Sequence, residues 1–475
     1  MKQARFSSWI PWILLLFCSV CYVSLIFNQN VWMDEAFTAS LIRTDMSGVI
    51  SRSMQDTLPP LYNILLKLMT DAFGYSVPVM KLTSVLPMIA TLVLSATVVK
   101  KRHGLMSCCL WMLALTFMPL MLNFGIEIRM YSWGFFFATA SGVFAYEVIY
   151  ESRPKNWILF TLFSVLAGYT HHFAFVTAGT VYFFLLLYYL IKDRAHVRRW
   201  FFCVLATTLL YLPCLLTTLK QIGRVSGYFS MPEVTFSVFV KYMIYPFITG
   251  NRILSVLLGL GMLLLYGYGL YRQKTAPSGR QAYALLCPVP YYIVLLFGTA
   301  ISKIMTANIF VDRYLFFACG LIWLFFAIEI SILPPLRFGK KSLPWAAVAI
   351  PFLILIGLFT GHDAWKQEYG QDPADMIGYF QSHVQENDAL LIYSDSEALY
   401  WCLQFYEPAF KPYSSAKDAL NALHEGETDT VWIAVEEGRT VADLEEDAGE
   451  KLPIEQAGDF AFDRYDFTLY RLTSD

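Results

Sequence analysis

The chain has 475 residues, of which 57% are hydrophobic and 15% are charged. This composition excludes a set of soluble domains as an account of most of the chain, so the lipid bilayer is its main solvent. Charge is unevenly divided, because residues 363–475 hold 25 acidic and 7 basic side chains against 12 and 28 in the rest. The acidic tail argues against nucleic-acid binding, which needs clustered basic charge.

Apolar runs long enough to span about 30 Å of hydrocarbon predict about eleven transmembrane helices. The first run follows Lys2 and Arg5 as a signal sequence would, but it has no small-residue cleavage site, so we expect it to remain as a span. The expected spans are 9–28, 78–99, 105–122, 131–150, 157–171, 173–191, 200–216, 253–271, 282–301, 313–332 and 343–360. An odd number of spans puts the two termini on opposite sides.

Basic residues predict the orientation, because cytoplasmic connections are enriched in Lys and Arg. They gather in every second connection, at 100–102, 153–155, 192–199, 272–280 and 337–341. The N-terminus is then cytoplasmic, and loops 29–77 and 217–251 and the acidic tail are external. This orientation fits a bacterial plasma membrane as well as an endoplasmic reticulum, and the compact length favours the bacterial plasma membrane.

Two regions outside the spans have structure of their own. In loop 29–77, the segment PPLYNILLKLMTDAFG places an apolar stripe on one face of a helix that starts after two prolines, which predicts a helix lying in the membrane interface. We therefore assign residues 1–361 to a transmembrane domain with interfacial helices in loop 29–77.

The tail, residues 362–475, alternates helical stretches with strand-like runs at ALLIYS, TVWIAV and FTLYRL. This alternation predicts a small extracytoplasmic α/β domain. The tail has no glycine-rich phosphate loop, so no nucleotide is assigned to it. The fold class is thus an α-helical polytopic membrane protein with a C-terminal α/β domain.

Four polar groups fall on the predicted external side, which points to one site. They are Asp34 with Glu35; Asp56 with Pro59 and Tyr62; Glu127, Arg129 and Tyr131; and His171 with His172. Each has a structural alternative. The carboxylate pair suits general base work or metal binding, or it could be a solvated helix end.

The cationic groups have alternatives as well. Arg129 could hold a phosphate or form a structural ion pair with Glu127. The two histidines could be interface residues or, with Asp34 and Glu35, ligands of a divalent metal such as Mg or Mn. Arg313, in DRYL, is more often an interfacial anchor than a site residue. No cofactor is firmly implied.

The ordered set WMDEAFTA, DTLPPLYNILLKL, FGYSVPVMKLTSVLP, EIRMYSW and YTHHFAF resembles the membrane glycosyltransferase family that includes dolichyl-phosphate-mannose protein mannosyltransferases and bacterial family 39 relatives. The resemblance covers about residues 30–180 and, more loosely, DRYL. It implies the GT-C fold, an acidic catalytic motif in the first external loop, and a polyprenyl-phosphate sugar that enters from the membrane.

On this resemblance the family's acidic pair corresponds to Asp34 and Glu35, and Asp34 becomes the candidate general base. The family often has His or Lys directly before the two prolines, whereas this chain has Leu58. The donor phosphate would therefore need Arg129, Lys67 or a metal. An external site fits a lipid-linked donor, because nucleotide sugars are made in the cytoplasm.

The expected activity is transfer of a sugar, with inversion, to an external acceptor that is a protein, a wall polymer or a glycolipid. The main alternative is a transporter or lipid flippase, which usually places polar groups near mid-membrane and has related halves. A sensor whose tail binds a ligand is a third reading. It leaves the motifs of the first loop unexplained.

Overall fold

The computed structural model falls into two compact units. Unit 1 comprises Met1–Ile26, Thr44–Gly74 and Val79–Asp363, and unit 2 comprises Phe27–Arg43, Tyr75–Pro78 and Ala364–Asp475. The segment with Asp34 and Glu35 thus belongs with the C-terminal residues. The structure describes residues 2–228, 233–305, 308–338, 341–370, 372–385, 387–394, 397–407, 411–413, 415–449, 451–462 and 465–473.

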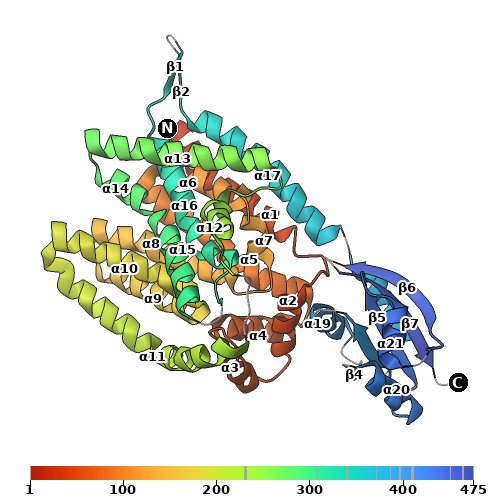
Figure 1. Ribbon diagram of the computed structural model, residues 1–475. Helices are drawn as coiled ribbons and strands as arrows, with labels where there is room; N and C mark the ends of the chain where they lie inside the picture. The colour runs from red at the N-terminus through yellow and green to blue at the C-terminus, as the bar shows by residue number, and fades with distance from the viewer. Residues whose placement is uncertain are drawn as a thin grey trace. The chain divides into compact units, whose positions relative to one another are not determined.

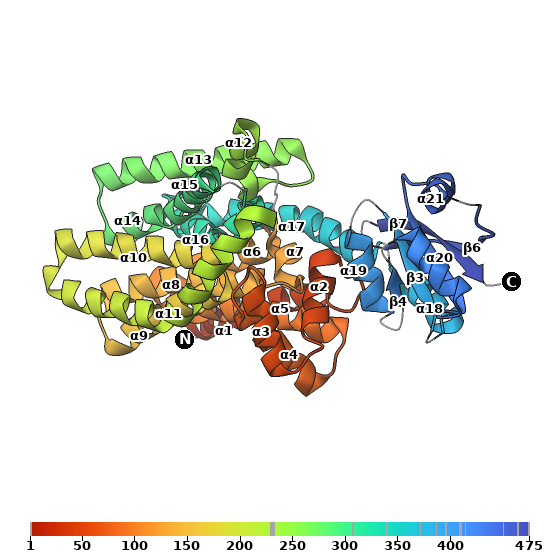
Figure 2. The ribbon, with the colours of Figure 1, turned by 60° about the horizontal axis from the view of Figure 1, so that its bottom comes forward.

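Unit 1 is almost entirely helical, and α8, α9 and α10 lie side by side in both views (Figure 1; Figure 2). Its helices are α1 (Lys2–Val23), α3 (Met46–Gln55), α4 (Leu61–Phe73), α5 (Val77–Leu94), the π-helix η1 (Ser95–Val99), α6 (Lys100–Phe117), α7 (Met121–Ile126), α8 (Tyr131–Tyr150), α9 (Pro154–Thr170), α10 (His172–Lys192), η2 (Arg194–His196), α11 (Val197–Tyr228), α12 (Phe236–Ile244), η3 (Tyr245–Phe247), α13 (Arg252–Thr275), α14 (Gly279–Leu286), α15 (Val289–Ile304), η4 (Asp312–Leu315), α16 (Phe316–Ile332) and α17 (Ala346–Tyr369). A two-stranded hairpin joins α16 to α17, formed by β1 (Leu336–Phe338) and β2 (Lys341–Leu343).

Seven helical stretches among the described residues are long and apolar enough to cross a bilayer. They are Val77–Phe117, His172–Lys192, Arg194–Lys220, Arg252–Thr275, Gly279–Ile304, Asp312–Ile332 and Ala346–His383, and Ser8–Val23 is a shorter apolar helix. The expected spans 131–150 and 157–171 are the helices α8 and α9. The number of eleven spans remains a prediction.

The stretch Val77–Phe117 contains the expected span 78–99 and most of the expected span 105–122, with a break at Gly104. The second span was predicted too long, because the helix ends at Phe117 and a separate helix, α7, begins at Met121. Gly104 has φ 91° and ψ 171°, a conformation that a residue with a Cβ atom rarely adopts. The chain can therefore change direction there even though the residues before it are helical.

Helix α4 lies where the interfacial helix was expected. Its buried face carries Tyr62, Leu66 and Thr70, whereas Leu68, from the predicted apolar stripe, is 52% exposed. One face of α4 is thus packed against the protein, and another face is exposed. The packed face holds α4 on the protein, whereas Leu68 of the apolar stripe is left exposed. A position of α4 in the membrane interface remains a prediction.

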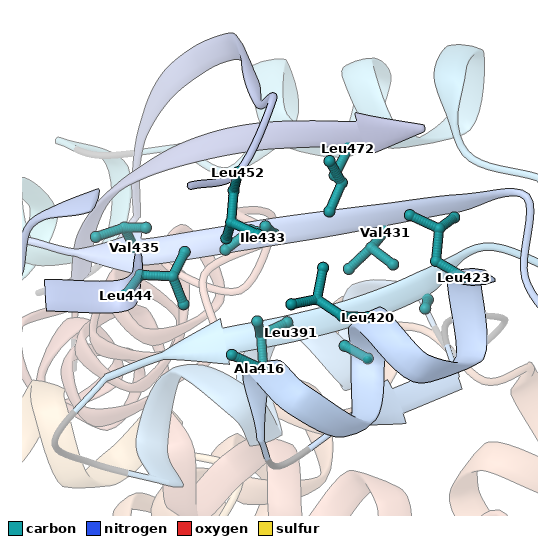
Figure 3. Close-up of a cluster of buried hydrophobic side chains, with 12 residues drawn as sticks. Leu391, Ala416, Leu420, Leu423, Val431, Ile433, Val435, Leu444, Leu452 and Leu472 are labelled. Carbon is teal, nitrogen blue, oxygen red and sulfur yellow. The ribbon is translucent and has the colours of Figure 1, made fainter. Parts of the chain in front are cut away.

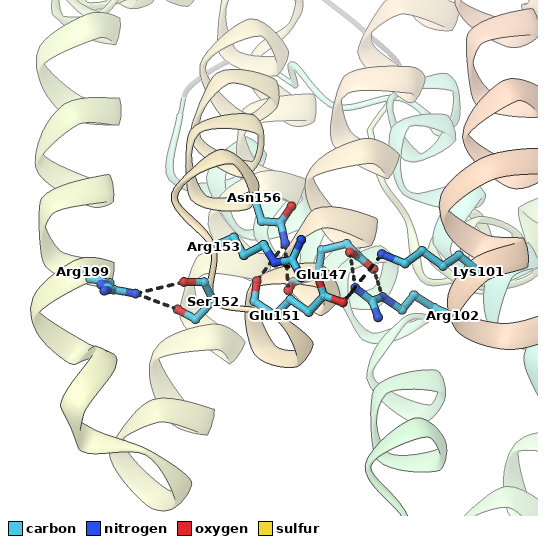
Figure 4. Close-up of polar contacts among 8 residues, drawn as sticks. All are labelled: Lys101, Arg102, Glu147, Glu151, Ser152, Arg153, Asn156 and Arg199. Carbon is cyan, nitrogen blue, oxygen red and sulfur yellow. Dashed lines mark hydrogen bonds and ion pairs between the residues drawn. The ribbon is translucent and has the colours of Figure 1, made fainter.

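Three basic connections meet in one polar network in unit 1 (Figure 4). Arg102, whose side chain is 6% exposed, forms an ion pair with the buried Glu147 and a second pair of 2.8 Å with Glu151. Lys101 and Arg153 also pair with Glu151, and Arg199 donates to the carbonyl of Ser152 at 3.0 Å. The basic connections at 100–102, 153–155 and 192–199 therefore lie close together, on one side of the helix bundle.

The Arg102 guanidinium holds the pKa of Glu151 below its usual value, chiefly through their hydrogen bond. A lowered folded-state pKa means that the ionised carboxylate stabilises the fold at neutral pH. That contribution is lost as the pH falls from the unfolded-state pKa through the folded-state pKa.

We expect Arg102→Gln to lower the free energy of unfolding by about 3 kcal/mol, because it leaves Glu147 buried without its ion-pair partner. Denaturant unfolding in detergent micelles measures this change. Arg153→Gln is the control, since that side chain is 64% exposed, and it should change the value by less than about 0.5 kcal/mol. Equal effects of the two changes would contradict the prediction.

The C-terminal part of unit 2 is a five-stranded mixed sheet with the strand order β4-β3-β5-β7-β6. Strands β4, β3 and β5 are parallel, and β7 and β6 are antiparallel to their neighbours. The strands are β3 (Ala389–Tyr393), β4 (Lys411–Tyr413), β5 (Thr430–Glu436), β6 (Glu455–Phe462) and β7 (Tyr465–Thr473). The helices of this unit are α2 (Met33–Leu41), α18 (Ala374–His383), α19 (Glu397–Tyr406), α20 (Ala416–His424) and α21 (Val441–Ala448).

The core of the sheet lies between its central strands and helices α20 and α21 (Figure 3). Leu391 and Ile433 are adjacent in the β3–β5 register, and both side chains belong to the cluster. Leu420 and Leu444 come from the two helices. Branched side chains on parallel strands that face helices are the usual content of such a layer.

Candidate functional site

Asp34 and Glu35 occupy the first turn of α2, where the structure gives them different environments. The carboxylate of Glu35 accepts a hydrogen bond of 3.1 Å from the amide of Trp32, and Glu35 is only 4% exposed. Asp34 is half-buried. Glu35 therefore caps the helix through its own side chain, whereas Asp34 keeps partial access at the helix N-terminus.

The residues just before Asp34 are held by helix α19 of the same unit. The hydroxyl of Tyr406 donates to the carbonyl of Gln29 at 2.9 Å and accepts from the amide of Val31 at 3.0 Å. The Asn30 side chain donates to the carbonyl of Glu368 at 2.9 Å. An otherwise extended segment is thus fixed by three hydrogen bonds, immediately before the candidate base.

Helix α2 also packs on α19 through side chains. Phe37 meets Trp401 edge-on, with ring centroids 5.3 Å apart. At the far end of α2, Arg43 donates to the Phe405 carbonyl at 3.1 Å and to the Tyr75 hydroxyl at 3.0 Å. Burial raises the pKa of that Tyr75 hydroxyl, although Arg43 opposes the shift.

We expect Tyr406→Phe to loosen the segment before Asp34, because it removes the two hydrogen bonds of the hydroxyl. At about 1 kcal/mol for a net hydrogen bond, amide exchange at Val31 should become about fivefold faster or more. Hydrogen-exchange mass spectrometry of the full chain measures it. Tyr400→Phe is the matched control on the same helix, and unchanged exchange in Tyr406→Phe would contradict the prediction.

Unit 1 contains a separate polar cluster at the first residues of α8, α10 and α16. Tyr131 is 0% exposed, and its hydroxyl has no hydrogen-bond partner among the described residues. His171 is 2% exposed, and its ring lies 4.6 Å from the rings of both Tyr314 and Phe317. A buried hydroxyl without a partner is costly, so the cluster is suited to a polar ligand.

The tautomer of His171 follows from its hydrogen bond. Its Nδ1 accepts from the amide of Phe173 at 3.1 Å, so the neutral ring carries its hydrogen on Nε2. That Nε2 is buried and has no partner in the described part of the chain. His171 therefore offers a hydrogen-bond donor, as does the Tyr131 hydroxyl.

The charges of Arg129 and Arg313 act on both Tyr131 and His171, so two cationic side chains lie near the cluster. Glu127 acts on Tyr131 with the opposite sign. Four predicted residues from two separate motifs are therefore brought together with Arg313. Two arginines and two neutral donors form an arrangement that suits a phosphate.

Two further side chains border the cluster in different ways. His172 faces outward from it toward α11, where the Tyr211 hydroxyl lies 3.4 Å from its Nδ1. Tyr245 is buried, which raises the pKa of its hydroxyl, and it interacts electrostatically with Glu127 and Tyr131. Tyr245 was not predicted, because it lies in a loop with no motif around it.

The predicted residues of the first loop have separate positions. Asp56 ends α3, and Pro59 is buried before α4. The Tyr62 hydroxyl lies 3.1 Å from the Ser84 hydroxyl on α5. Lys67 forms an ion pair of 2.7 Å with Asp71 one turn along α4, which gives it a structural partner.

Lys81 is a site candidate that the sequence interpretation missed. It lies on the first turns of α5 and is only 1% exposed. The indole of Trp133, near the start of α8, donates to the carbonyl of Thr83 at 3.0 Å, so this part of α5 packs beside the N-terminus of α8. A buried lysine in a spanning helix is a functional candidate by default, and its charge within an apolar run was the available signal.

Metal binding has little support from the residue clusters. Within the described ranges no three His, Cys, Asp or Glu side chains lie close enough to hold a metal ion. His171 already uses Nδ1 as an acceptor.

The chain shares its fold with solved membrane enzymes. It matches the crystal structure of ArnT from Cupriavidus metallidurans bound to undecaprenyl phosphate with a TM-score of 0.66 at 11% identity, covering 97% of this chain and 98% of that one. The apo structure of the same protein gives 0.65 at 11% identity over 98% of each chain. The chain has the GT-C fold.

The arabinofuranosyltransferase AftD from Mycobacteria is a more distant example of the GT-C fold, with a TM-score of 0.50 at 12% identity over 99% of this chain and 40% of that one. No protein-family model matches the sequence, and no curated protein resembles it significantly. The GT-C fold and the seven apolar helices make the chain a multi-pass membrane protein.

Proposed function

We propose that this protein is a glycosyltransferase that moves a sugar from a polyprenyl-phosphate donor to an extracytoplasmic acceptor. The observation that carries the proposal is the cluster of Tyr131 and His171, two buried hydrogen-bond donors beside two arginines, in a chain with the GT-C fold. The ArnT structure with undecaprenyl phosphate supports a lipid donor, because its fold is the same.

The cluster would bind the donor phosphate. A phosphodiester has one negative charge and several acceptor oxygens, which matches Arg129, Arg313, Tyr131 and His171. Lys81 adds a buried positive charge beside the start of α8. These groups stabilise the phosphate as it leaves with an increased negative charge, so they favour the transition state over the ground state.

Asp34 would act as the general base. It accepts the proton of an acceptor hydroxyl or amine while the acceptor oxygen or nitrogen forms a bond to the anomeric carbon. The bond from that carbon to the phosphate oxygen breaks at the same time, and polyprenyl phosphate leaves with the electron pair. A single displacement inverts the anomeric configuration, and positive charge develops on the sugar as in glycoside hydrolysis.

The proposed function includes a membrane topology that puts the site on the external side. Eleven spans with a cytoplasmic N-terminus would place Asp34, the phosphate cluster and residues 362–475 on the external side. The network of Figure 4 supports this arrangement, because it collects basic connections at the opposite ends of α8 and α10 from His171 and Tyr131. The C-terminal sheet would then be a soluble domain that faces the acceptor.

We expect Asp34→Asn to lower the rate of sugar transfer by about 100-fold or more, because the base is lost. Glu35→Gln is the matched control, since an amide oxygen can still accept from the Trp32 amide, and it should keep most of the activity. Transfer of radiolabelled sugar from a panel of polyprenyl-phosphate sugars to acceptors in membranes, at equal expression, measures both.

Other outcomes distinguish the parts of this proposal. If both variants transfer sugar like the wild type, the enzyme class stands and Asp34 is not the base. If Glu35→Gln is the more damaging change, the roles of the two carboxylates are reversed. If folded wild-type protein consumes no donor in the panel, the proposed activity is wrong.

We expect Tyr131→Phe to weaken binding of a short-chain polyprenyl phosphate about tenfold, the usual effect of losing a hydrogen bond to a charged group. Isothermal titration with the purified protein measures the dissociation constant. Tyr169→Phe is the control, because that hydroxyl donates to the Leu210 carbonyl outside the cluster. Equal affinity in Tyr131→Phe and wild type would contradict the phosphate assignment.

A further inference from the structure

Unit 1 contains a second cavity that the proposed reaction does not use. It has a volume of about 530 Å³, within the range of small-molecule pockets, and lies between α8, α10 and α14. Its wall is mostly apolar, and four tyrosines contribute to it: Tyr146, Tyr150, Tyr188 and Tyr283. Arg280 is the one charged side chain among the residues that line it.

Arg280 is held firmly in this wall. One of its terminal nitrogens donates to the carbonyl of His103 at 2.6 Å, to the Ser107 hydroxyl at 3.0 Å and to the Ser331 hydroxyl at 2.8 Å. All of these acceptors are neutral, and the Nε atom has no hydrogen-bond partner in the ranges that the structure describes. The guanidinium is therefore positioned without being neutralised by an ion pair.

The charged groups around Arg280 do not change this conclusion. Among the described residues no carboxylate forms an ion pair with it within 4.0 Å. Glu329 acts on it electrostatically without forming an ion pair with it, and the Glu329 carboxylate accepts hydrogen bonds of 2.8 and 2.9 Å from the Gln281 amide. On the other wall, Arg102 stacks over Tyr150 at 4.0 Å while its charge is met by Glu147.

The cavity lies at the opposite end of the helices from the phosphate cluster. On α8 the cluster is at Tyr131, whereas the cavity begins at Gly142 and continues to Tyr150. At 1.5 Å per residue, Gly142 is about 16 Å along the helix from Tyr131. The same separation holds on α10, between His171 and the lining residues from Val181 onward. The two are therefore distinct sites.

From this geometry we propose that the cavity binds one anionic glycerophospholipid, with an acyl chain between α8 and α10 and the phosphate on Arg280. Basic pockets between transmembrane helices attract anionic head groups, and an apolar wall that ends in one fixed cation matches a lipid with a charged head. Tyrosine rings in the wall suit the boundary between chain and head group. The proposal is independent of the proposed enzyme activity.

The test is lipid binding to the purified full chain, measured by native mass spectrometry with phosphatidylglycerol and with phosphatidylcholine of the same acyl chains. Wild type should retain one phosphatidylglycerol with a saturable affinity higher than that for phosphatidylcholine. Arg280→Gln should weaken phosphatidylglycerol binding about fivefold, the effect of one basic residue near a membrane surface, and leave phosphatidylcholine unchanged.

Two control pairs separate this site from general surface binding. Lys274→Gln removes an exposed basic residue at the end of α13 that does not line the cavity, and it should bind like wild type. Ala282→Trp fills the cavity and should abolish retention of the lipid, whereas Ala300→Trp, on the exposed side of α15, should not.

Three results would overturn the proposal: equal retention of the two lipids by wild type, equal losses in Arg280→Gln and Lys274→Gln, or wild-type binding by folded Ala282→Trp. Because the two cavity variants alter charge and volume separately, a folding failure in one leaves the other as the test. Sugar transfer is not a readout here, so failure of the enzyme proposal would not affect the result.

Discussion

A backbone in hydrocarbon must satisfy every amide and carbonyl within itself, and this constraint governs where the chain can place its chemistry. Continuous helix leaves no such backbone groups open, and in this chain the residues of the phosphate cluster lie at helix ends and breaks. Tyr131 begins α8, His171 separates α9 from α10, and Arg313 lies in the short turn before α16. The opposite ends of the same helices carry the ion network of Arg102 and the cavity at Arg280.

His171 illustrates how such an end can be rigid. It is the only residue between α9 and α10, and its own amide and carbonyl continue the hydrogen bonding of the two helices, to Ala167 and from Phe175. The side chain then closes the turn by accepting from Phe173. Its remaining nitrogen is therefore oriented before any ligand arrives, which lowers the reorganisation needed for binding. The same principle holds for Arg280, whose three neutral acceptors fix its direction.

The sequence predicted a mostly helical membrane protein because hydrophobic length is a local signal, whereas the number of eleven spans and the single site for all four polar groups remain predictions. The runs around Tyr131 and His171 are indeed helices, and their cluster with Arg129 and Arg313 follows from helix ends that share one side. The place of Tyr245 beside this cluster and the burial of Lys81 depend on packing between helices far apart in sequence, so neither could be predicted. Likewise, no local pattern showed that Glu35 would turn back to cap its own helix, or that Lys67 would pair with Asp71.

The attachment of residues 27–43 to α19 bears on how this protein can be recombined with relatives. A chimera that replaced residues 364–475 alone would set a foreign surface against Phe37, and it would remove the tyrosine that holds Gln29 and Val31. Any loss of activity in that hybrid would then result from a displaced Asp34 rather than from a changed acceptor preference. Exchanging residues 27–43 together with residues 364–475 keeps their shared packing. The part of the chain that can be exchanged as one unit is therefore discontinuous in the sequence.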